Sequence, residues 1–277
     1  AYFARRGRIE LEYRVVANRD EIATMGAEEL IDRIRTAFAY DEHEWNRERR
    51  IAFRGPGRSL GIEALLYLCP RCGRADGIRG ARGGRVRCGC GYELRLDAYG
   101  EFAPAAAAAP AAGHAAPAAP ATPAFRDPGE WHRWEKRALA AALDAAVEAG
   151  GSTESISPDS SGLKPVHATG VLVAERRVRL YRRERAKGRV RLRRVMTGDL
   201  LLLADRIVFQ GGRRREEFPL KDIGGMNVLY RNLFDFAVAE DLYRVKPRAA
   251  TRSLLKFLHA ARHLAARSGS TALGSES

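Results

Sequence analysis

The sequence lacks the long apolar stretch that a membrane-spanning helix requires. No run of about 18 apolar residues occurs. The nearest candidate, 103–124, is uncharged but contains five prolines, whose spacing cannot sustain a helix. The N-terminal arginines are not followed by an apolar core segment, so we expect no secretory signal.

Cysteine is scarce, and its placement is informative. The 277 residues include four cysteines, and all of them fall between positions 69 and 90. Disulfide frameworks usually spread their cysteines to join distant loops, whereas one tight cluster is typical of a metal site in a reducing compartment. The cluster therefore predicts a cytoplasmic metal-binding protein.

Recognisable catalytic patterns are also missing. The sequence has no nucleophile elbow, no phosphate-binding loop of the Walker type and no dinucleotide fingerprint. His259 and His263 are four residues apart, but no carboxylate lies between them as in zinc proteases, so we expect both on a helix surface. We predict no catalytic residue in this chain.

Positive charge is abundant and comes almost entirely from arginine. The net charge is +14, with six lysines among the 48 basic residues. Such an excess favours polyanionic partners, namely phosphates, anionic lipid or nucleic acid, without selecting one of them.

The first part of the chain, 1–102, is predicted to be a strand–helix unit followed by a zinc ribbon at 66–102. Apolar residues alternate from Arg8 to Val16, which indicates a half-buried strand. Asn18 and Glu21 form a capping-box pattern at the start of a helix that continues towards Trp45. The apolar run from Ile62 to Leu68 indicates a second strand.

The rest of the chain is predicted to alternate linkers and folded units, giving an α+β protein. An Ala/Pro linker at 103–128 precedes a helix at 129–149, in which Trp131 and Trp134 are expected to pack in a core. A second linker occupies 150–169. Short strands and a final amphipathic helix at 170–268 follow the plan of a pleckstrin-homology-like (PH-like) antiparallel β-barrel, and 269–277 is expected to be a disordered tail.

The cysteines form two close pairs, Cys69-x-x-Cys72 and Cys88-x-Cys90. Two tight turns, each supplying a pair of thiolates, suit a tetrahedral zinc ion, and four thiolates leave no open position for catalysis. We therefore expect a structural Zn²⁺. Reduced thiols without metal and a redox-active site are the alternatives.

The densest basic stretch runs from Glu175 to Arg194, with eleven basic and two acidic residues. On paired strands these side chains would line a positively charged face, which predicts a phosphate or anionic-lipid site. The alternative is an ordinary solvated face. The candidate anion-binding residues are Arg177, Arg179, Arg182, Arg183, Arg191 and Arg193.

Several segments resemble one bacterial enzyme family. GIEALLYLCPRCG (61–73) and CGCGYELRLDAYGEF (88–102), together with RRGRIELEYRVV, FAYDEHEWNRERR, EWHRWEKRAL, GDLLLLADRIVF and FPLKDIGGMNVLY, are similar to the region that follows the catalytic domain in some lysophospholipid (1-acylglycerol-3-phosphate) acyltransferases. The likeness covers nearly the whole chain outside the linkers, and its sharpest part is the cysteine segment.

This resemblance implies a non-catalytic accessory region. The parent enzyme would transfer an acyl chain from a thioester to a lysophosphatidate-like acceptor at the inner face of the cell membrane. Its catalytic domain, which carries a His and an Asp separated by four residues, is absent from this chain, where His43 is followed at that distance by Glu48. The implied partners are that domain and an anionic membrane surface. A zinc-ribbon nucleic-acid-binding protein and a protein-interaction scaffold remain the alternative functions.

Overall fold

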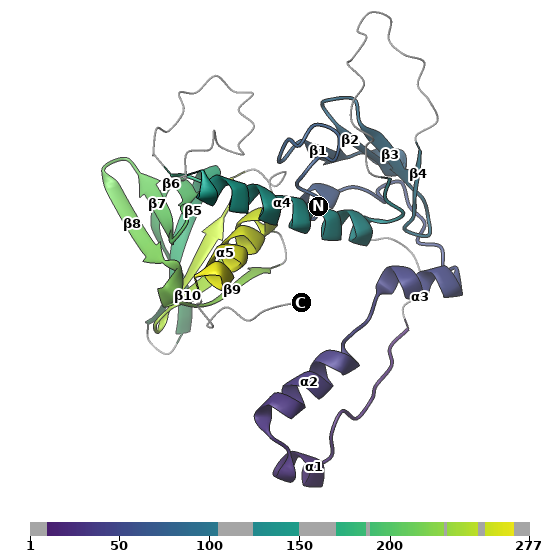
Figure 1. Ribbon diagram of the computed structural model, residues 1–277, viewed down its shortest axis with the longest axis horizontal. Coiled ribbons are helices and arrows are strands. Elements are labelled where there is room, and N and C mark those ends of the chain that lie inside the picture. Colours follow the sequence, from purple (N-terminus) through teal and green to yellow (C-terminus); the bar gives the residue numbers. More distant parts are fainter. Residues whose placement is uncertain are drawn as a thin grey trace, which may run out of the picture.

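The computed structural model describes residues 10–104, 124–149, 170–186, 189–229, 232–248 and 253–268. These residues form an α+β structure with two antiparallel sheets, as the sequence predicts (Figure 1). The predicted linkers lie mostly outside the described residues, at 105–123 and 150–169, and so does the predicted tail, 269–277.

The described part of the chain contains the following elements. The helices are α1 (Arg19–Thr24), α2 (Ala27–Ala37), α3 (Glu42–Arg49), α4 (Pro128–Glu148) and α5 (Leu255–Arg267), with 3-10 turns at Ile62–Ala64, Arg82–Gly84 and Leu220–Asp222. The strands are β1 (Ile78–Gly80), β2 (Arg85–Cys88), β3 (Glu93–Leu96), β4 (Phe102–Pro104), β5 (Val173–Ala186), β6 (Arg189–Leu202), β7 (Arg206–Gly211), β8 (Arg214–Pro219), β9 (Ile223–Leu229), β10 (Leu233–Val238) and β11 (Asp241–Lys246).

The smaller sheet belongs to the cysteine module, which we define as residues 51–104. Its strands follow the order β1-β2-β3-β4. Its core contains Ile78 and Val86 from the sheet together with Trp131 from α4, which is fully buried. A sheet this small cannot bury much apolar area by itself, so the indole of Trp131 supplies a large part of the core.

The larger sheet has seven strands in the order β8-β7-β6-β5-β11-β10-β9. Helix α5 packs against it through Phe257, Leu258 and Leu264, and the second half of α4 adds Leu139 and Leu143 to the same core. Strands β8 and β9 are the two edges and do not pair with each other, so this sheet is not a closed barrel.

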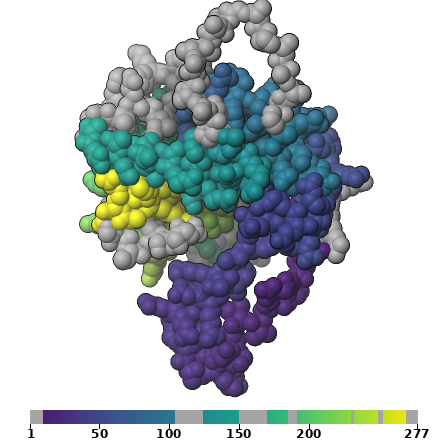
Figure 2. Space-filling model, turned by 45° about the vertical axis from the view of Figure 1, so that its right-hand side comes forward, coloured from purple at the N-terminus to yellow at the C-terminus, as the bar shows by residue number. Residues whose placement is uncertain are grey.

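Helix α4 connects the two cores. It begins with Pro128 at its first turn, and the side chain of Asp127 caps it by accepting a hydrogen bond from the backbone N–H of Glu130 at 2.8 Å. Its first turns pack on the cysteine module and its later turns on the seven-stranded sheet. In the space-filling view the helix lies across both parts (Figure 2). The prediction that Trp131 and Trp134 pack in a core is confirmed.

Residues 10–40, which we call the arm, project away from the rest of the molecule (Figures 1 and 2). The expected strand at 8–16 is not formed by its described residues, because 10–16 has no neighbouring strand to pair with. The expected long helix is divided into α1, α2 and α3: Gly26 separates the first two, and Asp41 caps the third. The capping box of Asn18 and Glu21 is confirmed.

Two further expectations are corrected. The apolar run from Ile62 to Leu68 is a 3-10 turn and a loop, because its side chains point into two cores: Leu66 packs in the module core and Tyr67 in the core of the seven-stranded sheet. The strands expected from residue 170 onwards are not all short, because β5 extends over 14 residues and absorbs an irregularity between Glu175 and Val178. Arg177 adopts a left-handed conformation at this irregularity, with φ 56°.

Candidate metal centre

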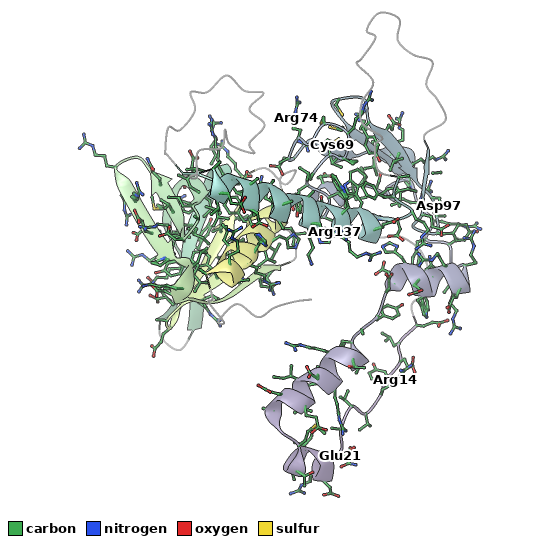
Figure 3. The ribbon with its side chains drawn as sticks, viewed as in Figure 1. Arg14, Glu21, Cys69, Arg74, Asp97 and Arg137 are labelled. Atoms are coloured by element: carbon green, nitrogen blue, oxygen red, sulfur yellow. The ribbon has the colours of Figure 1, made fainter. Side chains whose placement is uncertain are left out.

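The four cysteines converge on one point of the cysteine module, where Figure 3 labels Cys69. Their sulfur atoms all lie within 4.8 Å of one another. The Sγ atoms of Cys69 and Cys90 are 3.7 Å apart, and those of Cys72 and Cys88 are 3.8 Å apart. The sequence-predicted ligand set is thus brought together, with no disulfide among its members.

These distances fit a tetrahedral metal ion. A zinc–sulfur bond of about 2.3 Å in tetrahedral geometry places neighbouring sulfurs roughly 3.8 Å apart. The two measured contacts, each joining a sulfur from one turn to a sulfur from the other, match that separation. The donor set can therefore hold one thiophilic ion with four sulfur ligands.

Backbone N–H groups help to stabilise thiolates at this centre. The amides of Arg71 and Cys72 face the Cys69 sulfur, and the amide of Tyr92 faces the Cys90 sulfur. Burial nevertheless raises the pKa of the Cys69 thiol, and it raises the pKa of Cys88 as well. At Cys90 burial acts in the same direction, but the Tyr92 amide and the neighbouring sulfurs outweigh it, so the pKa is lowered. A cation is what would hold all four side chains as thiolates.

The turns around the sulfurs depend on glycine. Gly73 and Gly91, which follow the second cysteine of each pair, have φ values of 66° and 87°. A Cβ atom on Gly77 would lie 3.0 Å from the Cys88 sulfur, so the missing side chain makes room for that ligand. Gly89, the single residue between Cys88 and Cys90, has open space around it.

Helix α4 holds the segment that leads into the first cysteine. One carboxylate oxygen of Glu135 accepts hydrogen bonds from the backbone N–H groups of Tyr67 and Leu68, at 2.9 and 3.0 Å. The indole N–H of Trp131 donates to the carbonyl oxygen of Leu68 at 3.0 Å. The backbone immediately before Cys69 is thereby fixed by side chains distant in sequence.

The six candidate anion-binding arginines lie on β5 and β6, but they do not share one face. Arg182 pairs directly with Arg193 across the two strands, and both lie on the same side as Arg191. Arg183, opposite Leu192, points to the other side, as does Arg179. Arg177 lies at the irregularity, where its backbone N–H donates to Asp199 at 2.9 Å.

Part of this charge is compensated locally. Arg182 contacts Asp241 at 3.3 Å, and Arg193 contacts Glu184 at 3.3 Å. All of these side chains stay at least partly exposed. The structure thus places basic side chains on both faces of the ribbon formed by β5 and β6, where the sequence predicts a single face.

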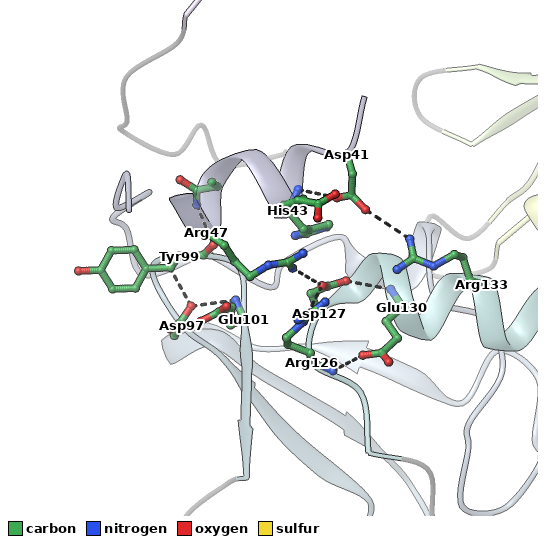
Figure 4. A network of polar contacts seen from close by, with 12 residues as sticks. Asp41, His43, Arg47, Asp97, Tyr99, Glu101, Arg126, Asp127, Glu130 and Arg133 are labelled. Carbon is green, nitrogen blue, oxygen red and sulfur yellow. Dashed lines mark hydrogen bonds and ion pairs between the residues drawn. The ribbon is translucent and has the colours of Figure 1, made fainter. Parts of the chain in front are cut away.

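A cavity of about 530 Å³ lies where the arm meets the cysteine module. It is lined by aromatic and aliphatic side chains that include Tyr40, Trp45, Phe53, Leu60 and Tyr99. Ion pairs and hydrogen bonds fix its walls (Figure 4). Arg47 of α3 contacts Asp127 at 3.2 Å, and Asn46 donates to the carbonyl oxygen of Tyr99 at 2.8 Å.

The expectation that His259 lies on a helix surface is wrong. Its Nδ1 atom is 3.0 Å from the hydroxyl of buried Tyr67, and its ring is 5.1 Å from that of His132. His263 instead pairs with Asp144 at 2.7 Å. Local sequence patterns could not predict these contacts, because they join residues from three separate segments.

Comparison with protein-family models gives no match, and comparison with curated proteins gives none either. Among solved structures, a chain described as "The 8S snRNP Assembly Intermediate" is similar at 12% sequence identity, with a TM-score of 0.28, over 37% of this chain and 87% of that chain. A similarity this weak carries no argument about fold or function. In the part of the chain that the structure describes, no helix has both the length and the apolar character to cross a bilayer.

Proposed function

We propose that this chain is the non-catalytic accessory region of a membrane-peripheral bacterial lysophospholipid (1-acylglycerol-3-phosphate) acyltransferase. In this proposal the four cysteines hold a structural zinc ion in a ribbon. The seven-stranded sheet with α5 acts as a PH-like unit, and its basic ribbon contacts anionic lipid or a partner. The arm is the surface on which the catalytic domain packs.

The exposed apolar surface of the arm is the observation that carries this proposal. Helices α1 and α2 bury no residue, and helices of 6 and 11 residues are marginal in water without tertiary packing. Of the ten large hydrophobic side chains that are exposed among the described residues, eight lie in the arm: Leu11, Tyr13, Val15, Ile22, Ile31, Ile34, Phe38 and Tyr40. An apolar patch of this kind marks a protein contact.

The catalytic domain is the occupant that the sequence favours. The segments RRGRIELEYRVV and FAYDEHEWNRERR, which overlap the two ends of the arm, are among those that resemble the region following that domain. The cavity beside Tyr40 and Trp45 continues the apolar surface of the arm and offers space for a side chain of the partner. We therefore expect one continuous interface that includes the arm and this cavity.

Three features support the metal and sheet parts of the proposal. The sulfur–sulfur distances fit zinc, and four thiolates fill its coordination sphere, which suits a structural role. The order of seven antiparallel strands and one C-terminal helix supports a PH-like unit, although the sheet stays open where the sequence predicts a barrel. The arginines of β5 and β6 give the ribbon the charge that anionic lipid attracts.

Binding between this chain and the catalytic domain tests the proposal that the chain is an accessory region. Sequencing of the reading frame upstream of this chain should reveal a catalytic domain in which a His and an Asp are separated by four residues. That domain, expressed separately, should bind this chain, and Ile31→Glu should weaken binding at least tenfold. Leu192→Glu, at an exposed site outside the arm, serves as the matched control. Absence of such a domain, or equal binding by both variants, would overturn the proposal.

Vesicle sedimentation tests the role of the basic ribbon. Replacing Arg179 and Arg183, which lie on the same face of β5, by Gln removes two charges worth about 1 kcal/mol each at an anionic surface, so binding should fall roughly 30-fold. Arg87→Gln, an exposed substitution in the cysteine module, is the control. Equal binding to neutral and anionic vesicles would remove the lipid role.

Salt-sensitive binding to RNA in place of vesicles would favour the nucleic-acid alternative, because exposed arginines on both faces also suit a phosphate backbone.

A further inference from the structure

A buried group of three ionisable side chains joins the cysteine module to the seven-stranded sheet. Lys256 of α5 forms an ion pair with Asp76 of the module and a second one, at 2.8 Å, with Glu175 of β5. The three side chains are 4%, 6% and 0% exposed. A lysine this deeply buried stays charged only with carboxylates beside it, and here they come from two different units of the fold.

The position of Asp76 is set by the first cysteine turn. Within that turn the backbone N–H of Cys69 donates to the carbonyl oxygen of Arg74 at 3.1 Å, and the N–H of Asp76 donates to that of Tyr67 at 2.7 Å. Asp76 itself adopts a left-handed conformation, with φ 54°, which aspartate tolerates better than most residues do. The loop that presents Cys69 and Cys72 to a metal therefore also aims the Asp76 carboxylate at Lys256.

The same loop holds the start of α5 at additional points. The backbone N–H of Ser253 donates to Asp76 at 3.3 Å, and the hydroxyl of Ser253 donates to the carbonyl oxygen of Ala64 at 2.7 Å. One turn further along the helix, His259 contacts the Tyr67 hydroxyl. The first turns of α5 are thus attached to the cysteine module as well as to their own sheet.

We propose that metal occupancy of the four-cysteine centre controls how firmly α5 and β5 are held against the cysteine module. With the ion bound, the loop 67–76 keeps Asp76 beside Lys256. Without it the loop relaxes, Asp76 withdraws, and Lys256 and the Ser253 amide lose a buried partner. This inference rests on the proposed metal site and assigns it a second role, in which the seven-stranded sheet responds to gain or loss of the ion.

Hydrogen exchange of the full chain, with zinc bound and after removal of zinc by a chelator, tests the inference without any substitution. We expect amide exchange in 253–258 and 173–180 to accelerate at least tenfold on zinc removal. Exchange in β7 and β8, which lie two and three strands away from β5 in the sheet, should stay the same within a factor of two. Zinc content is measured on the same samples.

A substitution separates this coupling from general loosening. In Lys256→Met the ion contact no longer exists, so removing zinc should change exchange at the start of α5 by less than a third of the wild-type effect. Lys246→Met, at an exposed lysine of β11, is the matched control and should keep the full effect. If Lys256→Met does not fold, the wild-type exchange experiment decides the matter.

The outcomes separate this inference from the proposal on which it rests. A chain that binds and releases zinc with no change in α5 exchange would overturn the coupling alone and leave the metal site intact. A chain that takes up no zinc would overturn both. Uniform acceleration over β5 to β11 would also contradict the inference, because it would mean that the whole unit unfolds without a specific route through Asp76 and Lys256.

Discussion

The carboxylate of Glu135, on α4, accepts the backbone N–H of Leu68, the residue directly before the first cysteine, at 3.0 Å. The same oxygen accepts the N–H of Tyr67, and the other oxygen contacts His132 at 2.7 Å. Glu135 is fully buried, and burial raises its pKa against the opposing effect of His132 and the two amides. A buried acid on one helix thus orders the backbone that presents a metal ligand.

Replacing Glu135 tests this arrangement. Glu135→Ala leaves two buried N–H groups without an acceptor, each worth about 1–3 kcal/mol, so the free energy of unfolding should fall by about 3 kcal/mol. Glu135→Gln keeps an acceptor oxygen and should lose less than half as much. Urea denaturation followed by tryptophan fluorescence measures both, with Glu148→Ala at the exposed end of α4 as the control. Equal losses for the two Glu135 variants would show that the amide contacts are unimportant.

Replacing Gly77 or Gly89 by alanine should affect zinc binding differently. Gly77→Ala places a methyl group 3.0 Å from the Cys88 sulfur, which must then move away from the ion. We expect zinc affinity to fall roughly tenfold or more, the size of effect seen when metal ligands are misplaced. Gly89→Ala has open space and should bind like the wild type. Competition with a zinc indicator measures both, and equal affinities would contradict the proposed ligand geometry.

Each cysteine should be required for tight zinc binding. Cys88→Ser removes a buried thiolate and leaves three sulfur ligands, so the variant should lose most of its zinc during purification. The exposed Arg71→Gln, between Cys69 and Cys72, is the control, because it leaves all four sulfur ligands in place. Retention of one zinc per chain by Cys88→Ser would mean that the ion is held elsewhere.

The lowered pKa of His259 predicts that the folded protein loses stability in mild acid. Its pKa is lowered to about 3, first by burial and then by the nearby His132, Lys136 and Arg262. The unfolded chain has a histidine pKa of about 6.5, so below that pH it binds a proton that the folded chain excludes. The stabilisation is complete above about pH 6.5 and decreases as the pH falls towards 3. At pH 5 this residue lowers the free energy of unfolding by about 2 kcal/mol relative to neutral pH.

The variant His259→Gln should remove this contribution. Between pH 7 and pH 5 the free energy of unfolding of the wild type should fall by about 2 kcal/mol more than that of the variant. His263→Gln, four residues along the same helix, is the control. Because acid also competes with metal binding in every variant, each profile is compared with that of the wild type at equal zinc content, and the difference for His259→Gln measures this residue. Parallel pH profiles would contradict its neutral, buried state.

Much of the fold could be predicted from local patterns. The capping box at Asn18, the helix around Trp131 and the final amphipathic helix each depend on residues close together in the sequence, and the structure contains all three. The cysteine pairs are also local signals, and their convergence follows from the geometry that a tetrahedral ion imposes.

The features that the sequence analysis missed depend on long-range packing. Lys256 occurs on a helix whose pattern gives no reason to bury a charge, and its partners lie 180 and 81 positions away. The arginines of β5 and β6 divide between two faces because successive side chains of a strand alternate, and the basic run includes neighbours such as Arg182 and Arg183. The strand expected at 8–16 has no neighbouring strand among the described residues, and strand pairing cannot be read from one segment alone.

X-ray absorption at the zinc edge, combined with metal analysis of the purified, reduced chain, tests the central claim most directly. The account predicts one zinc per chain with four sulfur neighbours at about 2.3 Å and no nitrogen or oxygen ligand. Less than half an equivalent of zinc, or a first shell that contains light atoms, would contradict it.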